Sequence, residues 1–88
     1  MFIKIMNLTQ TIQDIIKIKK TRQGSNGKDY LILELTQGES IFVFHNSDTP
    51  ESQWAELVEG NEYLFTVKEG NRIGSNVLIY FEKVDFIV

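Results

Sequence analysis

The sequence contains no cysteine, one proline and one histidine. The absence of cysteine excludes disulfide bridges and thiolate metal sites. A histidine-based metal site within one chain is not expected, because His45 is the only histidine and no zinc-ligand spacing is present. The sequence therefore predicts neither a bound metal nor a cofactor.

Long hydrophobic runs are also missing. No stretch approaches the roughly 20 apolar residues that a membrane-spanning helix needs. The run over residues 1–6 is shorter than the apolar core of a signal peptide. A protein that neither spans a membrane nor is secreted is the expectation, with the cytoplasm as its location.

Catalytic motifs are absent as well. The chain has no Walker loop, no G-x-G-x-x-G and no Ser/His/Asp set. Residues 70–74 contain two glycines but lack the lysine-serine pair that would cradle a phosphate. The carboxylates are spread over the predicted helix and turns, where water solvates them. We therefore predict that the protein is not an enzyme.

The composition is that of one small soluble domain. The 88 residues leave room for a single core, with 42% hydrophobic and 24% charged residues. We expect one domain over residues 1–88, in which residues 1–7 form either a loose arm or a strand that pairs with a partner.

The net charge of −3 is distributed unevenly. Residues 1–30 carry six lysines and arginines against two aspartates, whereas residues 31–88 carry three bases against ten acids. This asymmetry predicts one basic edge. The edge is either a phosphate-binding surface or a row of solvated lysines on an exposed strand.

Residues 9–22 have the alternation of a β-strand, and its phase changes where Ile15 and Ile16 are adjacent. A phase change inside a strand is typical of a bulge or a sharp bend. Small barrels need such a bend to let one strand take part in two sheets. We expect residues 9–22 to be a long, bent first strand, followed by a flexible loop over residues 23–29.

Residues 30–36 and 40–45 read as the next two strands, with Gly38-Glu39 between them. A type II′ turn prefers glycine at its first central position, so these two residues are expected to form the hairpin turn. That turn would set Gln37 opposite Ser40. The inward side would then be formed by Leu31, Leu33, Leu35, Phe42 and Phe44. The outward side would carry Tyr30, Ile32, Glu34, Thr36, Ile41, Val43 and His45.

Residues 49–60 are the one segment that reads as a helix. Pro50 suits the first helical position, and Gly60 offers the left-handed residue that often ends a helix. Trp54, Leu57 and Val58 share one face at helical spacing. A helix of about ten residues is too short to be stable alone, so we expect it to close one end of a barrel. Strands over residues 61–69 and 76–88 follow, the latter buried on both sides between residues 77 and 81.

The order strand, strand, strand, short helix, strand, strand resembles the OB-fold (oligonucleotide/oligosaccharide-binding fold), a five-stranded Greek-key barrel. The supporting features are the bent first strand, the glycine hairpin, the segment Trp54–Gly60 and the two glycine-bearing loops. The passage from Trp54 to Val67 looks like the helix-to-strand entry of single-stranded-DNA-binding and anticodon-binding members. The fold class expected is thus all-β with one short helix. An SH3-like small barrel is the alternative, although it normally lacks such a helix.

The resemblance implies a non-enzymatic binding module for single-stranded DNA or RNA, with little sequence preference. Its ligand would lie across the second and third strands, between the two flanking loops. Basic residues would bind phosphates and aromatic residues would stack on bases. Glu34 would repel phosphates there, and Tyr80 is a second aromatic candidate if it faces outward. The candidate residues are Lys17, Lys19, Arg22, Lys28, Tyr30 and Arg72.

A protein-interaction module, such as a homodimer, is the alternative function. The outward side of the second and third strands is apolar for a surface in water, and its rim is polar, as in protein interfaces. The residues predicted for this interaction patch are Ile32, Ile41, Val43 and His45.

Overall fold

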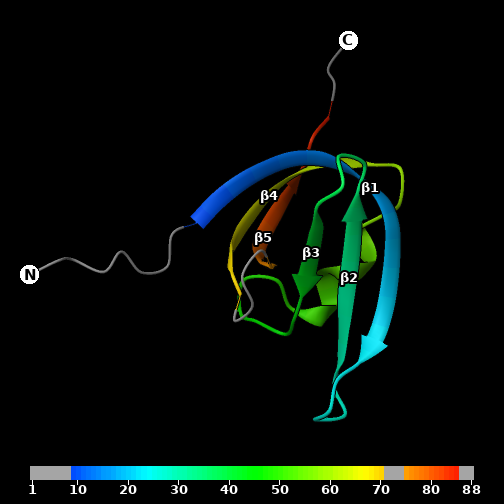
Figure 1. The fold of residues 1–88 in the computed structure, drawn as a ribbon, viewed down its shortest axis with the longest axis vertical. Helices are drawn as coiled ribbons and strands as arrows, with labels where there is room; N and C mark the ends of the chain where they lie inside the picture. The colour runs from blue at the N-terminus through cyan, green and yellow to red at the C-terminus, as the bar shows by residue number, and fades with distance from the viewer. Residues whose placement is uncertain (1–8, 71–74, 86–88) are drawn as a thin grey trace, which may run out of the picture.

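The computed structural model describes residues 9–70 and 75–85. Five strands form one sheet that closes on itself in the order β1-β2-β3-β5-β4, a small barrel-like fold (Figure 1). The elements are β1 (Thr9–Gln23), β2 (Asp29–Leu35), β3 (Ser40–Val43), the 3-10 helix η1 (Glu51–Glu56), β4 (Glu62–Glu69) and β5 (Asn76–Lys83). The predicted order of five strands and one short helix is confirmed. The expected arm over residues 1–7 lies outside the described residues.

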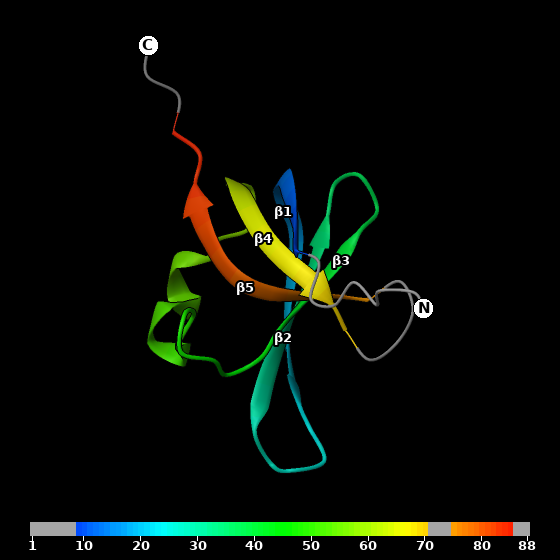
Figure 2. The ribbon, with the colours of Figure 1, turned by 90° about the vertical axis from the view of Figure 1, so that its left-hand side faces the viewer.

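β1 is the strand that joins the two halves of the sheet. Its first part, up to Ile15, pairs with β4, and its second part, from Ile16, pairs with β2. The register shifts between Ile16 and Ile18, so the bulge predicted at Ile15-Ile16 is confirmed to within about one residue. The strand curves around the others in Figure 1, and the β1–β2 hairpin extends past the rest of the sheet in Figure 2.

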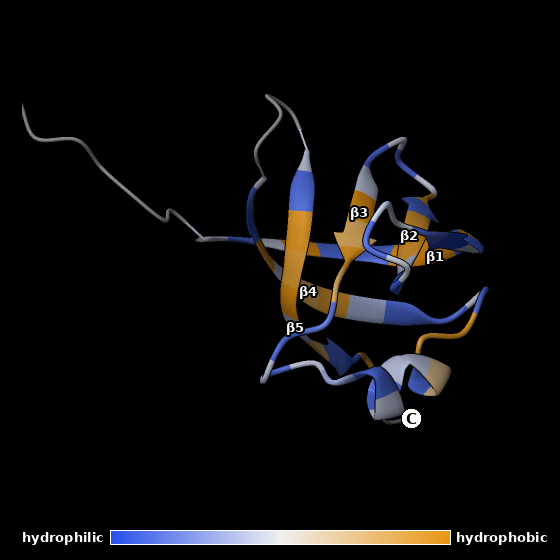
Figure 3. Cartoon of the chain, turned by 90° about the horizontal axis from the view of Figure 1, so that it is seen from below, coloured by the Kyte–Doolittle hydropathy of each residue, from blue (hydrophilic) through white to orange (hydrophobic). Residues whose placement is uncertain are grey.

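The core fills the inside of the closed sheet. Alternate residues of each strand point inward, as a strand with one buried side requires. Figure 3 shows hydrophobic residues along the strands, whereas the loop between β1 and β2 is largely hydrophilic. The buried hydrophobic residues are Ile16, Leu31, Leu33, Leu35, Ile41, Val43, Trp54, Leu57, Tyr63, Phe65, Val67 and Leu78.

The hairpin between β2 and β3 has a different register from the predicted one. Leu33 lies opposite Ile41, and Glu34 lies opposite Ser40. The Leu35 amide donates to the Glu39 carbonyl at 2.8 Å, which leaves three residues, 36–38, in the loop, and the Gly38 amide donates to the Leu35 carbonyl at 3.0 Å within it. Gly38 has φ of 100°, the left-handed conformation expected after a turn in a three-residue hairpin loop. The predicted two-residue turn at Gly38-Glu39 is therefore wrong.

This shift reverses which residues of β3 face inward. A change of register by an odd number of residues moves every side chain of a strand to the other side. Ile41 and Val43 are fully buried, whereas Phe42 is half-buried and Phe44 is 43% exposed. The prediction that Phe42 and Phe44 face the core, and that Ile41 and Val43 face out, is wrong for this reason.

A buried carboxylate on β1 holds the three-residue loop. The Asp14 carboxylate accepts hydrogen bonds from the Thr36 hydroxyl, from the Gln37 amide at 3.2 Å and from the Ile15 amide at 2.7 Å. Burial raises the pKa of Asp14, but these hydrogen bonds outweigh it and lower the pKa overall. The ionised carboxylate thus stabilises the loop that sets the observed register.

The helix is shorter than predicted. η1 spans six residues of 3-10 helix, and Leu57 is already extended, with φ of −87° and ψ of 101°. Tyr63 explains the early end, because its hydroxyl donates to the Glu56 carbonyl at 2.6 Å and accepts from the Val58 amide at 2.9 Å. These bonds replace the ones that would continue the helix. Trp54 and Leu57 are buried as predicted, whereas Val58 is 46% exposed.

β5 is less buried than its sequence suggested. Leu78 is buried, but Tyr80 is 45% exposed and the neighbouring apolar residues are half-buried. β5 pairs with β3 in parallel over two positions only, and with β4 over its length. The prediction of burial on both sides is therefore wrong for Tyr80. Among the described residues, no helix is long and apolar enough to cross a membrane.

Candidate functional site

The outer side of β2 and β3 carries three aromatic rings. Tyr30 lies on β2, Phe42 lies on β3 and Phe44 follows the end of β3. The ring centroids are 5.3 Å apart for Tyr30 and Phe44, 6.5 Å for Tyr30 and Phe42, and 6.3 Å for the two phenylalanines, whose planes differ by 9°. We call this surface, together with the half-buried Ile32 that is paired with Phe42, the aromatic face.

Basic residues of β1 border the aromatic face. Lys20 is paired with Ile32, and Arg22 is paired with Tyr30, so both lie on the outer side next to these residues. Arg22 is exposed, and within the described part of the chain its guanidinium donates only to the neighbouring Thr21 carbonyl, at 3.3 Å. The aromatic face therefore has basic residues along the border that it shares with β1.

Glu34 lies on the same surface, but its charge is balanced. The Lys20 ammonium is 2.6 Å from the Glu34 carboxylate. The hydrogen bond from Lys20 and the positive charges of Lys20 and Lys17 lower the pKa of Glu34, although some burial opposes them. Glu34 and Lys20 form a neutral pair, so the repulsion of phosphates expected from Glu34 is largely cancelled, and Lys17 adds one positive charge beside the pair.

The two lysines predicted for the outer side of β1 lie in different places. Lys17 is exposed at the bulge, close enough to affect the pKa of Glu34. Lys19 is paired with the buried Leu33, and its ammonium donates to the Trp54 carbonyl at 2.8 Å. Lys19 therefore holds η1 against β1 and does not belong to the aromatic face. The phase change at the bulge turns it toward the barrel end.

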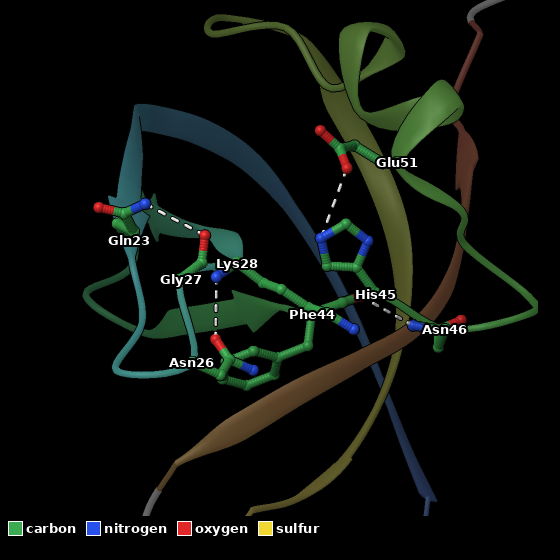
Figure 4. A network of polar contacts seen from close by, with 8 residues as sticks. All are labelled: Gln23, Asn26, Gly27, Lys28, Phe44, His45, Asn46 and Glu51. Carbon is green, nitrogen blue, oxygen red and sulfur yellow. Dashed lines mark hydrogen bonds and ion pairs between the residues drawn. The ribbon is translucent and has the colours of Figure 1, made fainter.

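The loop between β1 and β2 forms a second border. The Lys28 amide donates to the Asn26 side-chain oxygen at 3.0 Å, and the Gln23 side chain donates to the Gly27 carbonyl at 3.1 Å (Figure 4). Gly27 has a φ of 81°, which glycine adopts readily. These bonds order the loop, and the Lys28 side chain is exposed, as the sequence predicted.

A pocket of about 380 Å³ lies between this loop and the end of β3. Tyr30 and Phe44 belong both to the aromatic face and to the pocket, so the two are continuous. The other lining residues are Gly24, Ser25, Asn26, Lys28, Asp29 and His45.

His45 connects this pocket to the helix. Its ring nitrogen lies 3.4 Å from the Glu51 carboxylate (Figure 4), and its ring centroid is 5.0 Å from that of Trp54. His45 remains exposed, in the rim position expected from the sequence. Trp54 is 6% exposed, and its buried indole nitrogen has no hydrogen-bond partner among the described residues.

The predicted interaction patch is only partly on the surface. Ile32 and His45 lie outside, whereas Ile41 and Val43 belong to the core. Phe42, Phe44 and Lys20 take their place in the surface, and sequence reasoning missed all three. The sequence shows that Phe42 and Phe44 alternate with Ile41 and Val43. The expected two-residue turn, however, placed the phenylalanines inside and the other two residues outside.

The last two predicted residues are Arg72 and Tyr80. Arg72 lies outside the described residues. Tyr80 was a second aromatic candidate on the condition that it faces outward, and it is exposed. It is paired, however, with Thr66 of β4 and not with a residue of β2 or β3.

The described residues contain no group of three histidine or acidic side chains placed to hold a metal ion. No protein-family model matches the chain, and no curated protein matches its sequence significantly. The arrangement of the residues on the aromatic face and at its borders is therefore the basis for proposing a function.

Proposed function

We propose that this chain is an OB-fold domain that binds single-stranded nucleic acid without catalysis. The observation that carries the proposal is the aromatic face, with three rings on the outer side of β2 and β3. The closed five-stranded sheet and the helix between β3 and β4 support an OB-fold over an SH3-like barrel. In OB-folds the ligand lies across the second and third strands, which is where the rings are.

The chemistry of the face suits a single strand. Each base has a π-surface, and stacking on an aromatic side chain contributes about 1–3 kcal/mol whatever the base. Arg22 and Lys28 place positive charge at the borders of the ring cluster, and Lys17 adds charge beyond Glu34. Bases on the rings and phosphates along β1 therefore form the arrangement that the side chains favour.

Titration of a fluorescent oligonucleotide at low ionic strength tests the proposal. We expect saturable binding that weakens steeply with salt, because each phosphate contact releases a counterion. The variant Arg22→Gln should reduce the slope of log affinity against log salt by about 0.7. Absence of saturable binding at tens of micromolar protein would reject the proposed function.

A protein-interaction module is the second candidate, and the same surface supports it. Phe44 is 43% exposed next to Ile32 and Phe42, which gives an apolar centre with a polar rim. For a homodimer built on this face, sedimentation should show that Phe44→Lys converts the dimer to a monomer. An unchanged mass would remove this role from the face.

A further inference from the structure

The pocket between the β1–β2 loop and the end of β3, which we call the loop pocket, has walls suited to a planar ring. Tyr30 and Phe44 continue the aromatic face into it, and the pocket closes against His45 and the loop that contains Asn26. Its volume of about 380 Å³ lies at the lower end of the range for small-ligand pockets. A single nucleobase stacked on these rings is the part of a bound strand that such a pocket admits.

The charges of the lining do not favour a phosphate. Lys28 contributes one positive charge and Asp29 one negative charge, so the loop side of the pocket is neutral overall. A phosphate there would be attracted by the ammonium and repelled by the carboxylate. A neutral ring with polar edges meets no such repulsion and can use both groups.

The hydrogen bonds within the loop determine what remains for a ligand. The Asn26 side-chain oxygen is engaged by the Lys28 amide at 3.0 Å, which leaves the Asn26 amide nitrogen to donate. Within residues 9–70 and 75–85, neither the Lys28 ammonium nor the Asp29 carboxylate has a hydrogen-bond or ion-pair partner. The residues that line the pocket thus include two with free donors, Asn26 and Lys28, and one with a two-oxygen acceptor, Asp29.

Guanine is the base whose edges match this set. Its O6 and N7 accept hydrogen bonds, as lysine contacts to guanine commonly use, and its N1–H and amino group donate side by side to a carboxylate. Cytosine offers a single amino group to the carboxylate, adenine has no carbonyl acceptor, and thymine has a single N–H between two carbonyls. Guanine therefore gains the most contacts from Asn26, Lys28 and Asp29.

We infer that the loop pocket is a base-specific subsite that takes one guanine of a bound single strand. The inference rests on the proposed function, because the rest of the strand would lie on the aromatic face. It adds a preference at one position to a surface that otherwise tolerates any sequence. Stacking on Tyr30 and Phe44 would hold the base, and the three polar side chains would identify it.

The test compares short oligothymidines of about twelve nucleotides, within the range of OB-fold site sizes, with the same strands carrying one central guanine, adenine or cytosine. Fluorescence titration of the full chain should show that the guanine strand binds about fivefold or more tightly than the others, the lower limit for a good bidentate contact. Asp29→Asn should remove this preference while leaving oligothymidine binding equal or stronger. Asn26→Asp, which keeps the acceptor for the Lys28 amide, should also remove the preference.

Asp48→Asn is the matched control, since Asp48 is an exposed aspartate outside the pocket. It changes the net charge by the same amount and sign as Asp29→Asn and should retain the guanine preference. Saturable binding with equal affinity for all four strands would overturn the guanine subsite and leave the proposed function standing. A preference for another base, or a guanine preference that persists in both pocket variants, would also overturn it. No saturable binding of any strand would reject the proposed function itself.

Discussion

The ring of Phe44 lies 5.3 Å from the ring of Tyr30, on the outer side of the sheet. This pairing exists because β3 turns its even-numbered residues outward, and it creates an exposed aromatic surface in a chain with ten acidic residues after residue 30. The two rings belong both to the aromatic face and to the lining of the loop pocket. The contribution of this pairing to the proposed binding of nucleic acid can be measured separately from its contribution to the stability of the fold.

Phe44→Ala should weaken the binding of single-stranded nucleic acid by about 1–3 kcal/mol, the contribution of one stacked base. The free energy of unfolding should change little, because Phe44 is 43% exposed. Tyr80→Ala is the control, since Tyr80 is 45% exposed on another pair of strands. Fluorescence titration and urea unfolding measure the two quantities. Equal losses of binding in both variants would contradict the assignment to β2 and β3.

Lys19 and Lys17 should behave differently although they are two residues apart. Lys19→Met should lower the free energy of unfolding by about 1–2 kcal/mol, because the Trp54 carbonyl loses the charged one of its two donors and keeps only the Leu57 amide. Lys17→Met should leave stability nearly unchanged and reduce the salt dependence of binding by about one phosphate contact. Urea unfolding and salt titrations of both variants check this. The reverse pattern would show that Lys19 faces the ligand.

Trp54→Ala should destabilise the protein by about 3–5 kcal/mol, because the indole is 6% exposed and closes one end of the core. Trp54→Phe should cost much less, since it keeps an aromatic ring and removes a buried N–H that has no partner. Urea unfolding of the three proteins measures the difference. A small effect of Trp54→Ala would refute the role of η1 as the closure of the barrel.

Asp14→Asn should lower the free energy of unfolding at neutral pH by about 1–3 kcal/mol, because three hydrogen bonds to a carboxylate are weakened. The folded-state pKa of Asp14 is below its ordinary value of 3.8. The stabilisation is therefore fully present above that value and is lost as the pH falls below it, through the folded-state pKa. The gap in stability between the two proteins should close over this acidic range in urea titrations. A gap that does not vary with pH would mean that the charge on Asp14 is irrelevant.

Much of the fold is predictable from local patterns. The five strands, the helix between the third and the fourth, and the bulge near Ile15 and Ile16 all follow from alternation and from interruptions in it. The length of the helix does not follow from such patterns. The hydrogen bonds that end η1 come from Tyr63, which lies on the next strand and outside the segment whose spacing predicts a helix.

The candidate site is less predictable, because it depends on hairpin register. Gly38-Glu39 is a reasonable two-residue turn on local grounds. The competing three-residue loop is stabilised by Asp14, more than twenty residues earlier in the chain. Tyr30, Arg22 and Lys28 were placed correctly because their positions do not depend on that turn. Phe42 and Phe44 were misplaced because theirs does.

Asp14 is not part of the aromatic face, yet it holds Thr36 and Gln37 in the loop. The alternative turn would place both residues in strands and would exchange two phenylalanines on the surface for an isoleucine and a valine. If the face binds a ligand as proposed, selection on that binding can therefore act through Asp14, which lies outside the face. Screens for altered recognition should sample position 14 along with the residues of the face itself.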